Sequence, residues 1–355
     1  MTVHDPILAA AQRARATIPD DVAMLRAAAE LTRDLSSADA RIYWPDLLAS
    51  ALIGWGALAG AVLVDSVPLA IACAVVAMLA LYRAASFIHE LTHIRAGALP
   101  GFRAGWNLIV GIPLMIPSFM YEGVHTQHHA RTRYGTAEDP EYLPLALMKP
   151  WSLPLFILVA SLAPVGLILR FGVLTPLSLI IPPLRAKLVA ELSALSINPA
   201  YRRRAPEGAF ARMWAWQEAG ACLFALALVG SVFLFGWKPL LVYMAIHSAM
   251  TVINQLRTLV AHLWENEGDP MTVTAQYLDS VNVPPPGSLP ALWAPVGLRY
   301  HALHHLLPSV PYHNLAAAHR KLIATLDPQS PYHRGNYRGM LPLVGKIARS
   351  TMAAR

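Results

Sequence analysis

The chain has 355 residues, of which 55% are hydrophobic and only 14% are charged. A soluble domain carries about 25% charged residues, so this composition excludes an ordinary soluble protein and indicates an integral membrane protein. The net charge of +7 comes without a nucleic-acid-binding motif, and the two cysteines, Cys73 and Cys222, lie in apolar runs that argue against a disulfide framework.

The first 45 residues are polar, carry charges of both signs and lack the apolar core of a signal peptide. Within them, residues 6–35 have apolar side chains at helical spacing, among them Ile7, Leu8 and Val22. We expect residues 1–45 to form a cytoplasmic helical segment that precedes the membrane domain.

Four apolar runs are each long enough to cross a hydrocarbon core of about 30 Å, which takes roughly 20 helical residues. They form two pairs, and each pair is joined by a very short connection that holds one charge, Asp65 in the first and Lys238 in the second. The runs are 47–64, 67–88, 219–237 and 239–256. The sequence therefore predicts two helical hairpins.

Histidines recur at helical spacing in three places, all at or beyond the ends of apolar runs. The groups are His89 and His93; His125, His128 and His129; and His301, His304 and His305. Positions i, i+3 and i+4 share one face of a helix, so each group presents its imidazoles together. Neutral imidazole ligates iron, zinc, copper and nickel. Eight such ligands beside a bilayer suffice for two ions, and they favour paired iron that activates dioxygen for attack on a hydrocarbon.

A shared metal site constrains the topology, because all three histidine groups must lie on one side of the membrane. The hairpins preserve the side, so the proline-broken stretches 105–121 and 150–184 must each cross an even number of times or not at all, for example by re-entering. Basic residues gather on the histidine side, which the positive-inside rule makes cytoplasmic. They are Arg95, Arg103, Arg131, Arg133, Lys149, Arg185, Lys187, Arg202, Arg203 and Arg204.

The segments HELTH (89–93), HTQHH (125–129) and HALHH (301–305) resemble the three histidine boxes of the integral-membrane fatty acid desaturase family, whose superfamily includes hydroxylases, carotenoid ketolases and alkane monooxygenases. The flanks are also similar: Asp139-Pro140 follows the second box, and Leu307-Pro308 and residues 311–315 follow the third. The resemblance covers roughly residues 80–320. It implies an all-α integral membrane protein with about four transmembrane helices in two hairpins, and a cytoplasmic helical cap that holds a di-iron site.

The resemblance to stearoyl-CoA desaturases implies a ninth ligand between the second and third boxes, and its counterpart here is His262. In those enzymes an asparagine four residues earlier holds a metal-bound water. Here that position is Thr258, and Asn254, one turn further back, is the alternative.

Carboxylates should hold the outer nitrogens of the ligand imidazoles and fix their tautomers. For each candidate the alternative is a solvated surface charge. The candidates are Asp139, Glu265 and Asp269, with Glu138, Glu90 and Glu122 beside the boxes.

Two rival functions account for fewer of these residues. A zinc protease of the H-E-x-x-H type would use His89, Glu90 and His93 and leave both H-x-x-H-H triples unexplained. A metal transporter should place its histidines inside the bilayer rather than at the ends of the spans.

The nearest alternative lies within the same chemistry, because a di-iron site can desaturate or hydroxylate. The flanks resemble those of desaturases, so we expect oxygen-dependent desaturation of a fatty acyl chain, with hydroxylation of a lipid or hydrocarbon as the alternative. No histidine is expected to act as a general base.

The chemistry requires two external electrons per turnover. The sequence has no cytochrome b5 signature, no cysteine cluster and no dinucleotide fingerprint. We therefore expect a separate ferredoxin, rubredoxin or cytochrome to dock on the basic face. The expected setting is a bacterial inner membrane, with both termini and the boxes cytoplasmic, a membrane domain at 46–320 and a tail at 321–355.

Overall fold

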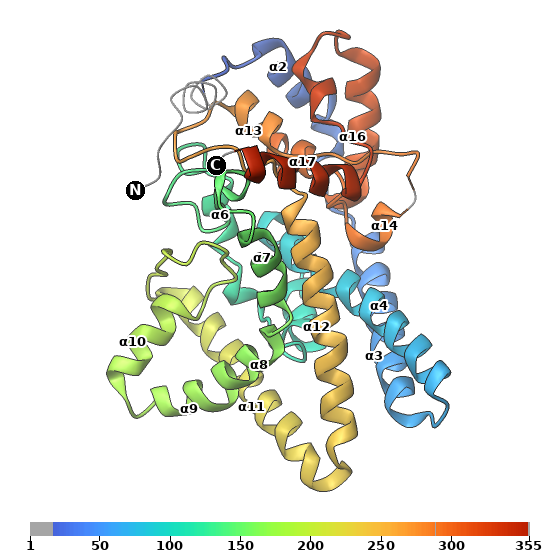
Figure 1. Ribbon diagram of the computed structural model, residues 1–355, viewed down its shortest axis with the longest axis vertical. Coiled ribbons are helices and arrows are strands. Elements are labelled where there is room, and N and C mark those ends of the chain that lie inside the picture. The colour runs from blue at the N-terminus through green and yellow to red at the C-terminus, as the bar shows by residue number, and fades with distance from the viewer. Residues whose placement is uncertain (1–16, 288, 354–355) are drawn as a thin grey trace.

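Two helical hairpins form the membrane part of the computed structural model, which describes residues 17–287 and 289–353 (Figure 1). The first pairs α3 (Ala40–Leu63) with α4 (Val67–His93), and the second pairs α11 (Gly208–Phe235) with α12 (Trp237–Leu259). All four are long and apolar enough to cross a membrane. The expected all-α architecture is confirmed, since the described residues contain no strand and only isolated β-bridges.

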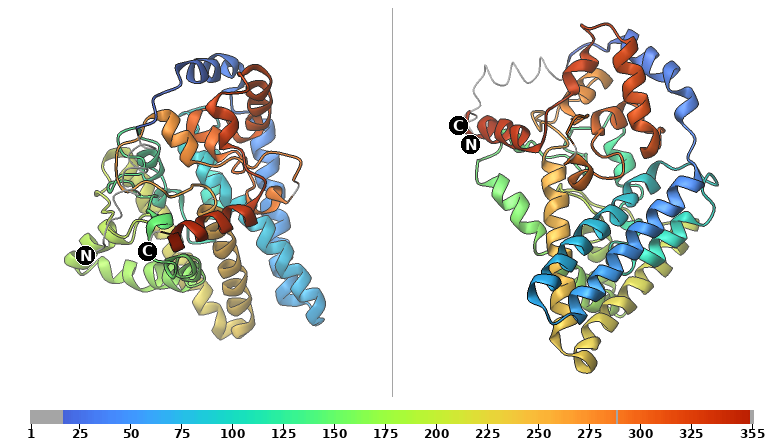
Figure 2. Two further views of the ribbon diagram at one scale, coloured as in Figure 1. Left: turned by 45° about the horizontal axis from the view of Figure 1, so that its top comes forward. Right: turned by 90° about the vertical axis from the view of Figure 1, so that its right-hand side faces the viewer.

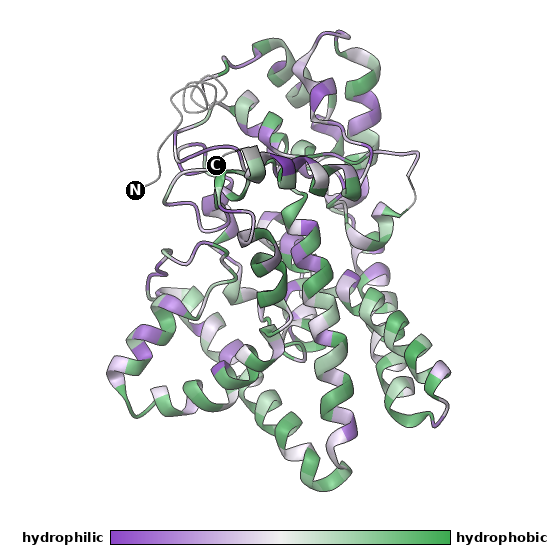
Figure 3. Cartoon of the chain, in the orientation of Figure 1, coloured by the Kyte–Doolittle hydropathy of each residue, from purple (hydrophilic) through white to green (hydrophobic). Residues whose placement is uncertain are grey.

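The two hairpins are held together in different ways. In the first, α3 and α4 approach so closely at Gly54 that a Cβ atom there would lie 2.7 Å from the side chain of Leu81. In the second, Gly236 alone joins the helices, with a φ of +72° that favours glycine. Their outer faces remain apolar and exposed, as at Leu52 and Phe233. Figure 3 shows this hydrophobic surface over both hairpins and more hydrophilic residues toward the cap.

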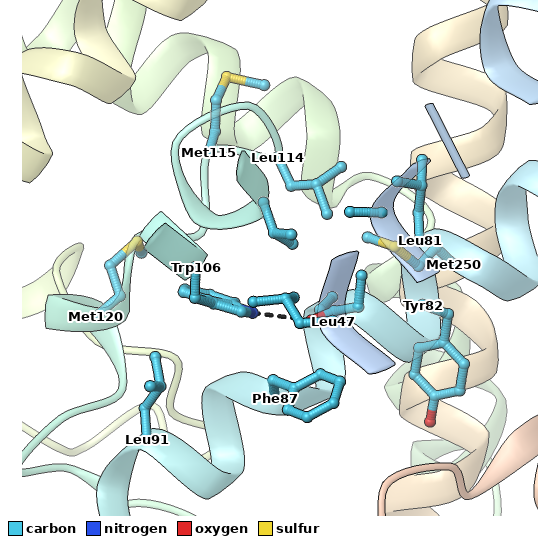
Figure 4. Close-up of a cluster of buried hydrophobic side chains, with 14 of the residues drawn as sticks. Leu47, Leu81, Tyr82, Phe87, Leu91, Trp106, Leu114, Met115, Met120 and Met250 are labelled. Atoms are coloured by element: carbon cyan, nitrogen blue, oxygen red, sulfur yellow. Dashed lines mark hydrogen bonds between the residues drawn. The ribbon is translucent and has the colours of Figure 1, made fainter. Parts of the chain in front are cut away.

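Residues 105–121, the first proline-broken stretch, pack into the helix bundle and then turn back on themselves. The stretch begins with α5 (Phe102–Trp106), continues as a π-helix (Asn107–Gly111) and then turns back. The two limbs are tied together because Asn107 Nδ2 donates to Ser118 Oγ (2.9 Å) and the Ser118 backbone N–H donates to Asn107 Oδ1 (2.8 Å). Trp106 anchors the stretch through a hydrogen bond to the Ala84 carbonyl, inside the cluster drawn in Figure 4.

The second stretch is a bent chain of short helices that also turns back. The segment Ser152–Ala160 meets Ala163–Ser178 at 53°, and the molecule has up to five spans if this pair counts as one. In Figure 1, α10 then leads back toward the cap. A buried ion pair holds the bend to α11: Arg170 Nη2 lies 2.7 Å from Glu218 Oε1, and Arg185 Nη2 lies 2.8 Å from Glu218 Oε2.

The cap covers the C-terminal end of each of α4 and α12 and is built mainly from the chain's two terminal regions (Figure 2). Residues 6–16 of the expected N-terminal helix lie outside the described residues, and the described part is α2, which packs against α16. The expected boundaries fall inside helices: residue 45 within α3 and residue 320 within α16.

The remaining α-helices are α2 (Val22–Leu31), α6 (His125–His128), α7 (Ser152–Ala160), α8 (Ala163–Ile168), α9 (Thr175–Ser178), α10 (Pro182–Glu191), α13 (Val273–Asp279), α14 (Pro290–Trp293), α15 (His301–Leu306), α16 (Tyr312–Thr325) and α17 (Met340–Ala353). A second π-helix spans Leu169–Leu174, and 3-10 helices span Arg33–Leu35, Ser118–Met120, Leu145–Leu147 and Pro331–Gly335.

Candidate metal centre

The three histidine groups meet where the membrane helices enter the cap. His89 and His93 occupy the last two turns of α4, so their i, i+4 spacing places both rings on one face. The second group forms α6 and its C-terminal cap, and the third lies on α15. His262 follows three residues after the end of α12. Nine histidines from four segments distant in sequence therefore converge.

These nine side chains form two clusters, and within each cluster the ring nitrogens lie within 4.8 Å of one another. The spacing of the triples explains the division: residues i and i+4 of a triple enter one cluster and residue i+3 enters the other. The clusters adjoin, with the rings of His129 and His305 stacked at 4.2 Å. The five-histidine cluster comprises His89, His93, His125, His129 and His304, and the four-histidine cluster comprises His128, His262, His301 and His305.

The inner nitrogens are spaced as ligands of a cation. In the five-histidine cluster His304 Nε2 lies 3.1 Å from His93 Nε2 and 3.2 Å from His129 Nε2. In the four-histidine cluster His301 Nε2 lies 2.9 Å from His262 Nε2 and 3.1 Å from His305 Nε2. Metal–imidazole bonds of about 2.1 Å at right angles place adjacent nitrogens about 3.0 Å apart. Both clusters therefore fit a metal ion.

Carboxylates hold the outer nitrogen of two of the rings. His128 Nδ1 lies 2.9 Å from Asp139 Oδ2, and His125 Nδ1 lies 2.9 Å from Glu141 Oε1. A carboxylate accepts hydrogen bonds, so Nδ1 carries the proton and each Nε2 presents a lone pair to the cluster. Tyr121 donates to the other oxygen of Glu141 at 2.8 Å. Lone pairs that face one another at about 3 Å repel, and a cation between them removes that cost.

His262 is held through a bridging tyrosine. The hydroxyl of Tyr134 lies 2.8 Å from His262 Nδ1 and donates to Asp279 Oδ2, also at 2.8 Å. Since the hydroxyl proton goes to the carboxylate, its oxygen accepts from Nδ1, and His262 presents Nε2 to His301. Both Tyr134 and His262 are buried.

Burial keeps most of the cap histidines neutral, as metal ligation requires. Burial is the main cause that lowers the pKa of six ligand histidines well below 6.5, and neighbouring histidines add to the effect. The six are His125, His129, His262, His301, His304 and His305. His128 differs: burial acts against its charged form, but Asp139 prevails and raises its pKa. Burial also raises the pKa of Glu141 to about 7.

Of the carboxylates expected to orient the ligands, Asp139 lies within hydrogen-bond distance of a ligand ring, and Glu90 Oε1 lies 3.7 Å from His89 Nδ1. Glu90 accepts from the Tyr43 hydroxyl and the Tyr312 backbone N–H, so it joins α3, α4 and α16. Glu122 is paired with Arg103 at 3.2 Å, and Glu138 has a side chain that is 75% exposed.

The remaining candidates lie on α12 and in the segment after it. Glu265 lines a cavity of about 190 Å³ together with Asn266 and Asp279. The backbone carbonyl of Asp269 accepts from the Asn266 side chain. Asn254 accepts from Arg257 at 3.3 Å, and the carbonyl of Thr258 accepts from the Ala261 N–H.

Glu141, Tyr134 and Asp279 are residues that the sequence reasoning missed. Glu141 stands two residues after Asp139, next to the Asp139-Pro140 pair that follows the second box. This position in the sequence could have marked it as a candidate. Asp279 lies seventeen positions beyond His262 and carried no such signal.

Comparison with known proteins agrees with this geometry. The fatty acid desaturase family model matches residues 65–337. The chain is 50% identical over 332 residues to a ceramide hydroxylase of Caulobacter vibrioides (strain NA1000 / CB15N), which covers 93% of this chain and 94% of that protein. No solved structure matches.

Proposed function

Because the chain belongs to the fatty acid desaturase family of membrane di-iron oxidoreductases, we propose that it is an oxygen-dependent hydroxylase of a ceramide-type lipid. The observation that carries this proposal is the 50% identity to a ceramide hydroxylase along almost the full length of both chains. The flanks that led us to expect a desaturase are a few residues long. Identity over 332 residues is the stronger argument.

The nine histidines are the proposed ligands, five for one iron and four for the other. When bound, the iron pair supplies the oxidising chemistry that an unactivated C–H bond needs. The residues of this chain hold the rings in place: Asp139, Glu141 and Tyr134 keep a proton on the outer nitrogens of His128, His125 and His262.

Hydroxylation and desaturation differ in their atom balance. In both, dioxygen takes up two external electrons and two protons. Hydroxylation inserts one oxygen atom into the C–H bond and releases one water, whereas desaturation removes two hydrogen atoms and releases two waters. Desaturation of an acyl chain is the second candidate, and it retains the support of Asp139-Pro140 and of residues 311–315.

Lipid mass spectrometry separates the two outcomes. The full-length protein would be expressed in a host that contains ceramide and grown under isotopically labelled dioxygen, with a His128→Ala variant as the inactive control. We expect ceramide with one labelled oxygen atom. A ceramide that has lost two hydrogen atoms would replace the hydroxylase proposal with the desaturase one.

The proposed orientation places the histidine clusters, and both ends of the chain, in the cytoplasm of a bacterial cell. A hollow of about 1020 Å³ opens there beside Arg202 and Arg204, and its wall includes Gln127 on the helix that carries His125 and His128. We propose that the separate electron donor, a ferredoxin, rubredoxin or cytochrome, approaches through this hollow. Charge reversal at Arg202 and Arg204 should then raise the KM for the donor and leave the KM for the lipid unchanged.

A further inference from the structure

Arg257 is a partly buried cation next to the histidine clusters, and Glu141 is the carboxylate that feels its charge. Arg257 lies two residues before the end of α12, and its Nε atom is buried without a hydrogen-bond partner in the described part of the chain. Its Nη2 atom makes a long contact, 3.3 Å, with Asn254 Oδ1, and the Tyr82 side chain is a second hydrogen-bonding neighbour. A buried N–H group without an acceptor is costly, so the Nε atom indicates a missing polar partner.

By contrast, two other arginines of the membrane part have carboxylate partners. Arg83 lies 2.5 Å from Asp46, and Arg170 lies 2.7 Å from Glu218. Among the described residues no carboxylate comes within 4.0 Å of the Arg257 guanidinium. The positive-inside rule accounts for exposed loop arginines such as Arg95, but not for one whose Nε is buried inside the bundle.

Arg257 lies where α4, α12 and α14 meet. It lies beside Tyr82 of α4, whose hydroxyl donates to the backbone carbonyl of Trp293 at 2.9 Å. Trp293 ends the short helix α14, which contacts α12 and exposes Leu289 at its N-cap and Leu292 on its outer side. Figure 4 shows the Tyr82 ring beside α12, with its hydroxyl directed away from the apolar cluster.

The same arginine is close to the four-histidine cluster. After burial, its charge is among the causes that lower the pKa of both His262 and His301. A group bound by Arg257 would therefore lie between the end of the membrane helices and the metal ligands.

We propose that Arg257, with Tyr82 and Asn254, forms the subsite that binds the polar linkage of the lipid substrate, the amide carbonyl and adjacent hydroxyls of a ceramide, where α4 and α12 meet beneath α14. This inference rests on the proposed function. The guanidinium provides N–H donors for the carbonyl oxygen, and Asn254 and Tyr82 add polar atoms that can bond hydroxyls. Because the bound linkage lies beside the clusters, the C–H bond within their reach belongs to a carbon near the amide rather than to the middle of the chain.

The test measures binding separately from turnover. Iron-loaded full-length protein in lipid nanodiscs, without reductant, would be titrated with N-palmitoyl ceramide and with hexadecane, which has no polar group. The variants are Arg257→Gln and Arg257→Lys, and the matched control is Arg212→Gln, an exposed arginine near the start of α11. Iron per chain and the melting temperature are recorded for each.

We expect Arg257→Gln to bind ceramide roughly ten- to a hundredfold more weakly, the loss of a charge-assisted hydrogen bond. Hexadecane binding, iron content and melting temperature should not change, and Arg257→Lys should be intermediate. Tandem mass spectrometry of the wild-type product should place the new oxygen near the amide, and Arg257→Gln should scatter it along the chain.

The outcomes separate the two proposals. Equal ceramide binding by wild type and Arg257→Gln, or loss of iron from the variant, overturns the subsite and leaves the hydroxylase proposal standing. Arg257-dependent binding of a ceramide that is never oxidised supports the subsite and overturns the hydroxylase proposal. A wild type that does not bind ceramide overturns both.

Discussion

His128 and Asp139 form an enclosed pair in which the ring Nδ1 atom lies 3.0 Å and 2.9 Å from the two carboxylate oxygens. The side chains are 2% and 0% exposed. Backbone N–H groups of Gly135 and Glu141 donate to the same two oxygens at 2.9 and 2.8 Å. Every donor that faces Asp139 is an N–H group, so its acceptor role is fully used.

Asp139→Asn should weaken iron binding at the four-histidine cluster. An asparagine directs an NH₂ group against the backbone N–H of Gly135 or Glu141, so the side chain rotates or the loop shifts, and the ring of His128 loses its orientation. Such changes reduce metal affinity about ten- to a hundredfold. Iron per chain after dialysis against a chelator measures the loss. Glu138→Gln, at a neighbouring side chain that is 75% exposed, is the control and should retain its iron.

His262→Ala tests whether the ninth histidine is a ligand. Its Nε2 atom lies 2.9 Å from that of His301, and its outer nitrogen is held by Tyr134. We expect iron to fall from about two ions per chain to about one, because the four-histidine cluster loses a ligand and the five-histidine cluster does not. The control is His333→Ala, whose ring contacts the Asp327 carbonyl at an exposed site. A variant that holds two ions would show that His262 is not required.

The histidine boxes and the two hairpins could be predicted because their signals are local. A triple at i, i+3 and i+4 must share a helix face, and a long uncharged run must span the bilayer. The requirement for one shared site also predicted that residues 105–121 return to their starting side, and the Asn107–Ser118 bonds show such a turn.

Contacts between distant segments carried no local signal. Tyr134 and Asp279 are 145 positions apart and meet only after the cap has folded. Glu265 and Asp269 are close to His262 in sequence. In the fold, Glu265 lines the cavity of about 190 Å³, and the backbone carbonyl of Asp269 accepts from the Asn266 side chain. Proximity in sequence therefore pointed to Asp139, whereas the contact that holds His262 comes from Tyr134, 128 positions away.

The Arg170–Glu218 pair is a further contact that only the fold reveals, and it yields a stability prediction. Glu218 is bound by Arg170 at 2.7 Å and by Arg185 at 2.8 Å, and its side chain is 7% exposed. Glu218→Gln leaves Arg170 buried without its partner, which should cost about 3–5 kcal/mol. Thermal unfolding in detergent should show a lower melting temperature. Glu191→Gln, which loses only long, partly exposed pairs of 3.7 and 4.0 Å, should melt like the wild type.

Tyr134→Phe isolates the bridge between His262 and Asp279. The substitution keeps the ring, which lies 5.1 Å from that of His128 and 5.2 Å from that of His305, and removes only the hydroxyl. Asp279 Oδ2 then remains 4.0 Å from His262 Nδ1, too far for a hydrogen bond, so the imidazole loses its shorter acceptor and keeps only Ser280 Oγ at 3.2 Å. We expect faster loss of iron to a chelator from the four-histidine cluster, by about tenfold, with an unchanged melting temperature. Tyr243→Phe is the control, because its hydroxyl donates to the Pro113 carbonyl and contacts no ligand histidine or its carboxylate. If both variants release iron at the wild-type rate, the bridge does not orient His262, and the packing of the ring against its neighbours is sufficient.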